Sequence, residues 1–161
     1  MAILLNLNQI EWIRGADPIG ETFKWNGRFF RPINPGFEDL ALEILNSKLF
    51  NALLTERMFV PTRIAEDIVL DGYNLILEHA LIPVLTYPPE WSFAMYKEAA
   101  VFLLKLNLRC RDFGYELKGG HLWNILFQAA APIFVGFGSI VHRNDTARWV
   151  AFGEFAFSYV F

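Results

Sequence analysis

The sequence predicts an α+β fold with two lobes, and three features of the chain lead to this expectation. The first half combines a hairpin signal with further strand-like segments and one helical segment. A proline-bearing stretch at residues 82–89 then excludes regular helix. The second half begins with a long helical pattern and continues into a loop with polar side chains. We therefore expect one domain with a small lobe over residues 1–83 and a helical lobe over residues 84–161.

The small lobe is expected to contain an antiparallel sheet built around a hairpin. Residues 21–31 (ETFKWNGRFFR) place strand-favouring side chains on both sides of Asn26-Gly27, a dipeptide that strongly indicates a tight hairpin turn. Further strands are expected at residues 3–13, 62–66 and 73–78, the last two separated by a turn at Asp71-Gly72.

Helical spacing of apolar residues predicts three helices. The first begins at Asn34-Pro35, with Asn34 as its cap, and runs to about Thr55. The second runs from Glu90 or Ser92 to Asp112 and ends at Gly114. The third begins near Asn144-Asp145, and one of its faces is expected to hold Trp149, Phe152, Phe155, Ala156 and Tyr159.

The composition limits the classes of function. Of 161 residues, 54% are hydrophobic and only 19% are charged, so a folded chain is expected, with some apolar surface that faces a partner or a missing part of a longer chain. Lysines and arginines are scattered and the net charge is −3, which argues against nucleic acid as a partner. No apolar run is long enough to cross a bilayer. The single cysteine, Cys110, is expected to be buried, and the N-terminus lacks the features of a signal peptide, so a cytoplasmic location is expected.

The segment Leu117–Ile140 (LKGGHLWNILFQAAAPIFVGFGSI) holds the candidate site. Its order is a polar loop with His121 and Asn124, then two short strands joined by a tight turn, then a second glycine-containing turn. Phosphoryl transfer depends on positioned oxygen ligands and metal-held charge, and magnesium requires hard oxygen donors. A loop of this layout serves such chemistry when acidic side chains stand at two of its positions.

This segment resembles the Asp-x-His-x-x-Asn and Asp-x-Gly motifs of the aminoglycoside and choline phosphotransferase-like kinases. It is more similar still to the kinase-like region at the N-terminus of certain bacterial SAM-dependent methyltransferases. The matching stretches are residues 77–83 (LEHALIP), 87–93 (YPPEWSF), 117–127 (LKGGHLWNILF) and 132–140 (PIFVGFGSI). The resemblance implies a truncated protein-kinase-like two-lobed fold, with a small antiparallel sheet and helix followed by a helical lobe that holds the catalytic-type loop.

Position by position, the resemblance makes His121 the loop histidine and Asn124 the residue on the metal side. Gly119 occupies the slot of the catalytic-loop Asp, and Gly136 occupies the slot of the metal-binding Asp. ATP and magnesium are the cofactors that the resemblance implies, with Asn124 as a metal ligand. Both acids are replaced, so the expected alternative is that Asn124 braces the loop through backbone hydrogen bonds and that His121 is a loop histidine with its hydrogen bonds satisfied.

Two further features of a nucleotide cleft have candidates in the small lobe. Glu78 and His79 stand where a hinge strand would present backbone groups to an adenine, and the alternative is that His79 is an exposed residue at a sheet edge. A strand cation paired with a helix carboxylate is the second feature, for which Lys24 or Arg31 with Glu38 or Glu43 are candidates. The alternative for these charges is an ordinary solvated surface.

The sequence therefore favours a degenerate kinase-like domain that binds or scaffolds, in association with a methyltransferase-type system. Its expected partner is a protein or an adjacent methyltransferase domain, and self-association is a further expectation. The alternative is an active small-molecule phosphotransferase whose acids come from elsewhere in the chain, namely Asp112, Glu116 or Asp145.

Overall fold

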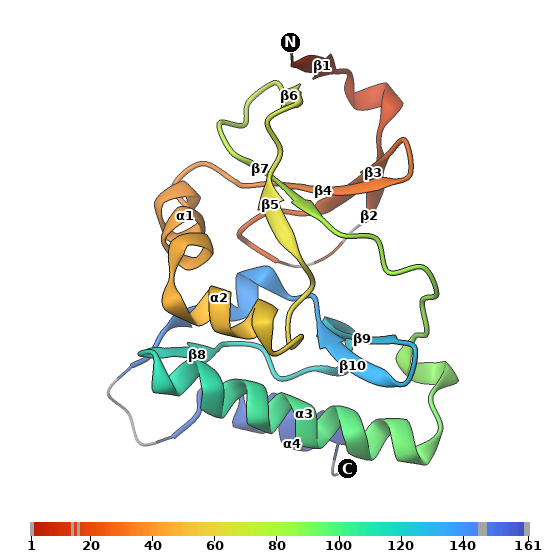
Figure 1. Cartoon of the computed structure of the whole chain (residues 1–161), viewed down its shortest axis with the longest axis vertical. Helices are drawn as coiled ribbons and strands as arrows, with labels where there is room; N and C mark the ends of the chain where they lie inside the picture. The colour runs from red at the N-terminus through yellow and green to blue at the C-terminus, as the bar shows by residue number, and fades with distance from the viewer. Residues whose placement is uncertain (1, 14, 16, 145–147, 160–161) are drawn as a thin grey trace. The chain divides into compact units, whose positions relative to one another are not determined.

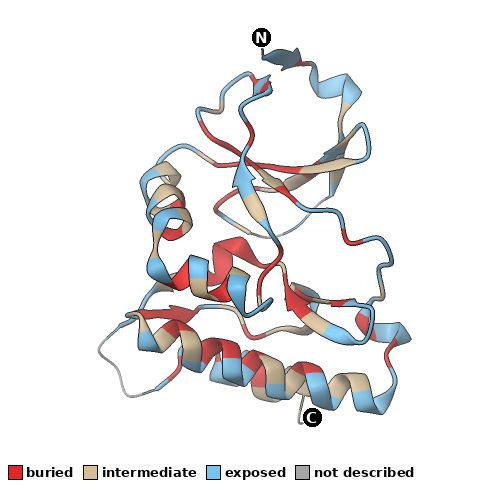
Figure 2. Cartoon of the chain, in the orientation of Figure 1, coloured by how far each residue is buried: buried red, intermediate tan, exposed pale blue. Residues whose placement is uncertain are grey.

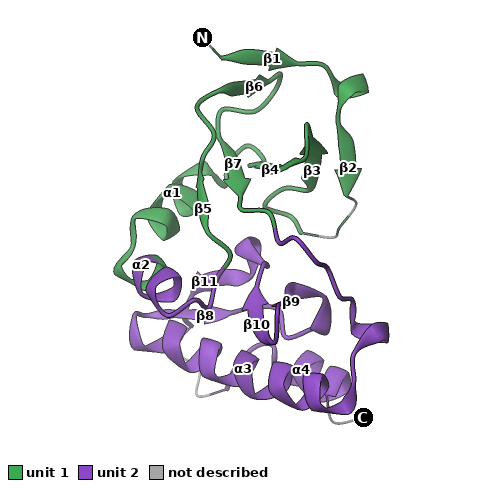
Figure 3. Cartoon of the chain, turned by 45° about the vertical axis from the view of Figure 1, so that its right-hand side comes forward, with its two compact units in different colours: residues 1–50, 60–81 green, residues 51–59, 82–161 purple. Residues whose placement is uncertain are grey.

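A computed structural model of the chain describes residues 2–13, 15, 17–144 and 148–159. The chain divides into two compact units (Figure 3). Unit 1 comprises residues 1–50 and 60–81, and unit 2 comprises residues 51–59 and 82–161.

Unit 1 is built on a five-stranded antiparallel sheet with the strand order β2-β3-β4-β7-β5. The expected hairpin is confirmed, because Asn26 (φ 47°) and Gly27 (φ 75°) form the turn in the left-handed conformation that a tight hairpin requires. The strands are β2 (Glu11–Ile13), β3 (Thr22–Trp25), β4 (Arg28–Pro32), β5 (Thr62–Ile64) and β7 (Ile76–His79).

A second, two-stranded parallel pair in unit 1 was not expected from the sequence. Strand β1 (Ile3–Leu5) pairs with β6 (Ile68–Leu70), so residues 3–13 supply two strands instead of one. The core of the unit lies between these pieces and the larger sheet. Phe23 and Phe30 stack at a ring-centroid distance of 5.3 Å and are fully buried at its centre.

The single helix expected over residues 34–55 is wrong, because the structure has two helices there. Helix α1 (Glu38–Asn46) begins after a turn at Gly36 (φ 92°), and α2 (Lys48–Thr55) follows it directly. Ser47 separates them, since its Oγ donates to the Ile44 carbonyl and accepts from the Phe50 N–H. Asn34 does not cap a helix, and its side-chain amide donates to the Pro18 carbonyl instead.

Unit 2 is organised around α3 (Phe93–Asp112), which runs along its lower side in Figure 1. The expected start and end are confirmed, because Ser92 accepts from the Met95 N–H and Gly114 (φ 84°) follows the last turn. The remaining elements are β8 (Tyr115–Leu117) paired with β11 (Ile140–His142), β9 (Ile125–Gln128) paired with β10 (Ala131–Phe134), and α4 (Phe152–Tyr159).

The core of unit 2 lies between α3 and the short strands (Figure 2). Cys110 is buried on the inner face of α3 as expected, and burial raises the pKa of its thiol to about 12. The expected start of the last helix falls partly on residues outside the described ones, and α4 begins at Phe152. Phe152 was expected on one face with Phe155, yet Phe152 is 59% exposed while Phe155 is buried. No helix in the described ranges is both long and apolar enough to cross a membrane.

Candidate functional site

The polar loop of unit 2 runs from the end of β8 to the start of β9, and three hydrogen bonds anchor its first residues. The Leu117 N–H donates to the Asn107 side chain of α3 at 3.0 Å, and the Leu117 carbonyl accepts from Trp149 Nε1 at 2.6 Å. The Lys118 N–H donates to the Ser139 carbonyl at 2.8 Å. The first bond joins the start of the loop to α3, and the bond from Lys118 holds it against the turn that follows β10.

Asn124 ends a short 3-10 turn (Leu122–Asn124) and lies where the loop meets that second turn. Its Nδ2 donates to Ser139 Oγ at 3.0 Å, and its backbone carbonyl accepts from the Val135 N–H at 2.9 Å. The amide is therefore held by the protein itself. This arrangement matches the bracing role that the sequence left open for Asn124.

Gly136 lies directly beside the Asn124 side chain. A Cβ built on Gly136 would lie 2.6 Å from Asn124 Cγ and 2.7 Å from its Oδ1, closer than real Cβ contacts. The backbone does not require glycine here, because φ is −80° and ψ is 70° and the Phe137 N–H donates to the Val135 carbonyl, which is an inverse γ-turn open to any residue. The Asn124 amide thus occupies the space that an acidic side chain at position 136 would enter.

Gly119 follows β8 and also lies beside the Asn124 side chain. A Cβ built there would be 3.1 Å from Ser139 Oγ, 3.4 Å from Asn124 Nδ2 and 3.7 Å from Glu154 Oε2. The structure therefore brings positions 119, 124 and 136 together. A small side chain at 119 needs only slight movement of its neighbours.

Glu154 is the carboxylate beside this loop, and sequence reasoning missed it. It stands in the first turn of α4, and its Oε2 accepts from the Gly120 N–H at 2.6 Å. The signal in the sequence was weak, since a single acid stands among the aromatic residues of the last helix. Its position next to the Gly119 slot makes it the nearest described carboxylate to a side chain added there.

His121 and the two described acids proposed from the sequence do not gather at one site. His121 Nδ1 is buried and has no hydrogen-bond partner among the described residues, which differs from the expected alternative of a satisfied loop histidine. Asp112 pairs with Arg109 at the end of α3, at 3.4 Å. Glu116 is buried within β8, where its Oε1 accepts from the Asn144 N–H at 3.5 Å. Asp145 lies outside the described residues.

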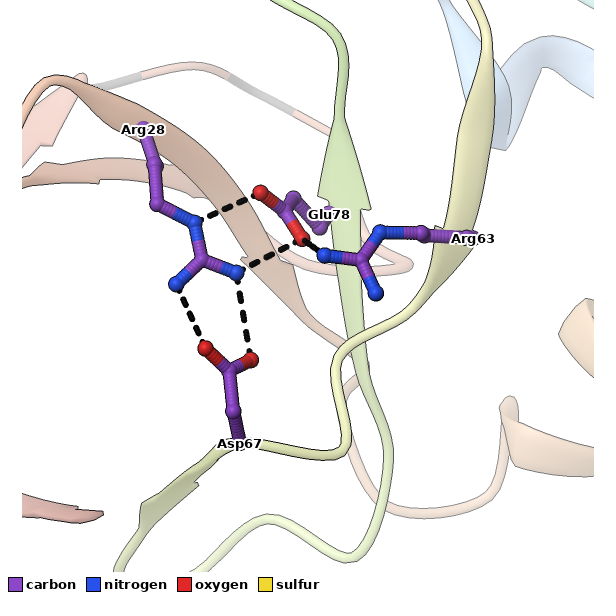
Figure 4. A network of polar contacts seen from close by, with 4 residues as sticks. All are labelled: Arg28, Arg63, Asp67 and Glu78. Carbon is purple, nitrogen blue, oxygen red and sulfur yellow. Dashed lines mark hydrogen bonds and ion pairs between the residues drawn. The ribbon is translucent and has the colours of Figure 1, made fainter. Parts of the chain in front are cut away.

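Glu78 belongs to an ionic network on the sheet of unit 1 (Figure 4). Arg28 donates to its two carboxylate oxygens at 2.6 and 2.7 Å and also binds Asp67 at 2.6 Å. Arg63 reaches the same Glu78 carboxylate. Hydrogen bonds from Arg28 hold the pKa of Glu78 below its usual value. Its side chain is therefore engaged within the sheet.

His79 is buried, so the alternative that described it as an exposed edge residue is wrong. The reason is the strand order, because β7 lies between β4 and β5 and His79 is flanked by Phe29 and Thr62. Its Nδ1 lies 2.8 Å from Thr62 Oγ1. Burial, and then the charge of Arg31, lowers the pKa of His79 to about 3.

Arg31 does not use a helix carboxylate as its partner. Its Nη1 donates to Asp17 Oδ2 at 2.7 Å and to the Gly20 carbonyl at 2.9 Å. Burial lowers the pKa of this guanidinium. The expected strand-to-helix ion pair from Arg31 to Glu38 or Glu43 is thus replaced by a pair between Arg31 on β4 and Asp17 in the loop before β3.

No protein-family model matches the chain. A solved structure of vaccinia related kinase 3 superposes with a TM-score of 0.54 at 12% sequence identity, covering 88% of this chain and 50% of that one. The chain has a protein-kinase-like fold. At this identity the likeness concerns the fold alone. The expected mixed fold with an antiparallel sheet and a kinase-like arrangement is confirmed.

The chain is also similar to a curated protein, the nodulation protein NoeA of Rhizobium meliloti (strain 1021). The two are 30% identical over 144 residues, which is 86% of this chain. The chain spans 30% of the length of NoeA. The similarity therefore concerns one part of a longer protein.

Proposed function

We propose that this chain is a degenerate kinase-like domain that binds a protein partner and does not transfer phosphate. The observation that supports this most directly is the Asn124 amide in the space beside Gly136. In the kinase-like resemblance an Asp at this position holds the metal, whereas here the neighbouring amide fills the space and is bound to Ser139.

The residues at the loop do not fit an ATP–magnesium complex. Magnesium favours several hard oxygen ligands in near-octahedral geometry. The two acidic slots are glycines, and the Glu154 carboxylate is engaged by the Gly120 N–H. Among the described residues no three His, Cys, Asp or Glu side chains gather in a metal-binding arrangement. We therefore assign no catalytic step to the loop.

The proposed context is a methyltransferase-type system, in which the domain adjoins or contacts a larger protein. NoeA is about three times as long as the region it shares with this chain, so a domain of this kind occurs next to further sequence in that protein. Because NoeA is named a nodulation protein, we propose that this chain acts in the same process through a protein contact.

A second candidate function is favoured by one specific observation. Glu154 Oε2 would lie 3.7 Å from a side chain at position 119, so this carboxylate stands next to the slot of the missing catalytic-loop acid. An active phosphotransferase would use Glu154 as the group that orients the acceptor hydroxyl. This candidate requires that Glu154 release the Gly120 N–H.

Titration calorimetry with ATP and magnesium separates the two candidates. The binding proposal predicts no magnesium-dependent heat for the natural chain, while the variant with Gly119→Asp and Gly136→Asp gains it if the scaffold is otherwise intact. The matched control has Gly119→Ala and Gly136→Ala, which adds the same Cβ atoms without carboxylates. Magnesium-dependent binding by the natural chain that disappears in Glu154→Gln would favour the phosphotransferase.

A further inference from the structure

A long open groove in unit 2 lies away from the loop. One wall is a single face of α3, whose lining residues recur every three or four positions from Ala94 to Asp112. At 1.5 Å per residue this face is roughly 27 Å long. The other wall comes from residues 56–58, after α2, and from Ala131-Pro132 at the start of β10. The groove has a volume of about 980 Å³.

Much of the groove lining is apolar and partly open to solvent. Val101 is 43% exposed and Leu108 is 63% exposed, and both stand on the lining face of α3. Phe102 and Pro132 add further apolar surface to the lining of the groove. Contiguous apolar surface of this kind on a folded chain is characteristic of an interaction site.

The rim of the groove has an excess of positive charge, although the whole chain has a net charge of −3. Arg109 pairs with Glu56 at 2.6 Å and with Asp112, and this cluster of one cation and two carboxylates has a net charge of −1. Lys97, Lys105 and Arg57 also line the groove, and none of them forms an ion pair with another described residue. Glu98 is the remaining acid, so the lining as a whole has four cations and three carboxylates, a net charge of +1.

Arg57 holds its place in the rim through an unusual backbone conformation. Its φ of 56° is left-handed, and two bonds close the end of α2, from the Arg57 N–H to Leu54 and from the Met58 N–H to Leu53. Glycine is the residue that normally takes this position after a helix, because it has no Cβ to clash. A strained arginine here places a cation at the groove at a cost in local stability.

We propose that this groove binds an amphipathic helix with acidic flanks from a protein partner. A helix in a groove presents apolar side chains at the same three- and four-residue spacing that the α3 face offers. Acidic flanks complement Lys97, Lys105 and Arg57, and such complementarity fixes register and speeds association. This kind of partner rests on the proposed binding function and makes it more specific, and it holds whether or not the loop binds nucleotide.

The test uses a fluorescent helical peptide and the whole chain. The probe is about 18 residues long, to match the groove length at 1.5 Å per residue, with leucines on one face and glutamates on both flanks. A second probe has lysines in place of the glutamates. Fluorescence anisotropy is expected to show saturable binding of the acidic probe below about 1 mM, and much weaker binding of the basic one. Equal binding of the two probes, or none, would overturn the proposal.

Variants locate the binding on the rim. Replacing Lys97 and Lys105 by Glu together is expected to weaken binding of the acidic probe at least tenfold, while Lys24→Glu, an exposed lysine of unit 1, leaves it unchanged. Arg57→Gly is expected to weaken binding without lowering the melting temperature, which a merely structural role of Arg57 would not produce. Unchanged binding in the double lysine variant would contradict the proposal.

Light scattering of the natural chain without peptide tests the competing occupant. A monomer agrees with a separate partner. A dimer that dissociates when Lys97 and Lys105 are replaced by Glu would assign the groove to a second copy of this chain and would overturn the assignment to another protein.

Discussion

Replacing Gly136 by Ala should destabilise the chain through Asn124 rather than through the backbone. The new Cβ would lie 2.6 Å from Asn124 Cγ, so the amide must rotate away and give up its 3.0 Å bond to Ser139 Oγ. Losing one partly buried hydrogen bond and leaving the Ser139 hydroxyl without its partner costs about 1–2 kcal/mol. For a chain of this size that lowers the melting temperature by roughly 3–6 °C.

A double-mutant cycle assigns this cost to Asn124. The free energy of unfolding is measured by urea denaturation for the natural chain, Gly136→Ala, Asn124→Ala and the double variant. With the amide gone, the three atoms nearest to the added methyl group are absent, and the methyl group also reduces the entropy of the unfolded chain, so its cost should fall to about zero. The expected coupling energy is therefore about 1–2 kcal/mol, within the range of residues in direct contact.

Additive effects would refute this reasoning. If Gly136→Ala cost as much in the Asn124→Ala background as in the natural chain, the amide would not occupy the space of the missing acid. The destabilisation would then have to come from the turn itself, although its φ of −80° is open to any residue.

Three further variants test other features of the molecule. Glu154→Gln should lower the free energy of unfolding by about 1 kcal/mol, since a neutral amide oxygen accepts from the Gly120 N–H less strongly than a carboxylate does. Thermal denaturation measures this loss, and Glu66→Gln, at an exposed acid of unit 1, is the control. The pKa of His79 is about 3 in the folded chain, below its ordinary 6.5, so the folded state binds fewer protons and stability falls as the pH is lowered below about 6.5. The slope should reach about 1.4 kcal/mol per pH unit between pH 6 and 5, and His79→Gln should flatten it in urea titrations; an unchanged slope would mean that His79 is protonated when folded. Arg57→Gly should raise stability by about 0.5–1 kcal/mol, because glycine adopts its φ of 56° without strain, and a loss of stability would show that the side chain itself holds the fold.

Local signals in the sequence predicted those parts of the fold that depend on neighbouring residues. The turn at Asn26-Gly27, the cap at Ser92 and the end of α3 at Gly114 were all expected, since each depends on the conformation of one or two residues. The break at Ser47 was missed because the apolar spacing continues across it. Only the paired bonds of its hydroxyl to Ile44 and Phe50 divide α1 from α2.

Contacts between distant parts of the chain were harder to predict. The sequence assigned Gly119, Asn124 and Gly136 to motif slots, and the structure shows that these positions lie close together around the Asn124 side chain. Glu154 approaches from α4, and nothing in the loop sequence specifies that contact. The burial of His79 likewise depends on β5 pairing outside β7, which local patterns do not reveal.

The most direct test of the central claim is ATP turnover by the purified chain in the presence of excess magnesium. With Gly119 and Gly136 in the acidic slots and Asn124 bound to Ser139, the rate should equal that of buffer alone, and Glu154→Gln should not change it. Magnesium-dependent turnover by the natural chain that is abolished in Glu154→Gln would contradict the account and would make the loop an active phosphotransferase site.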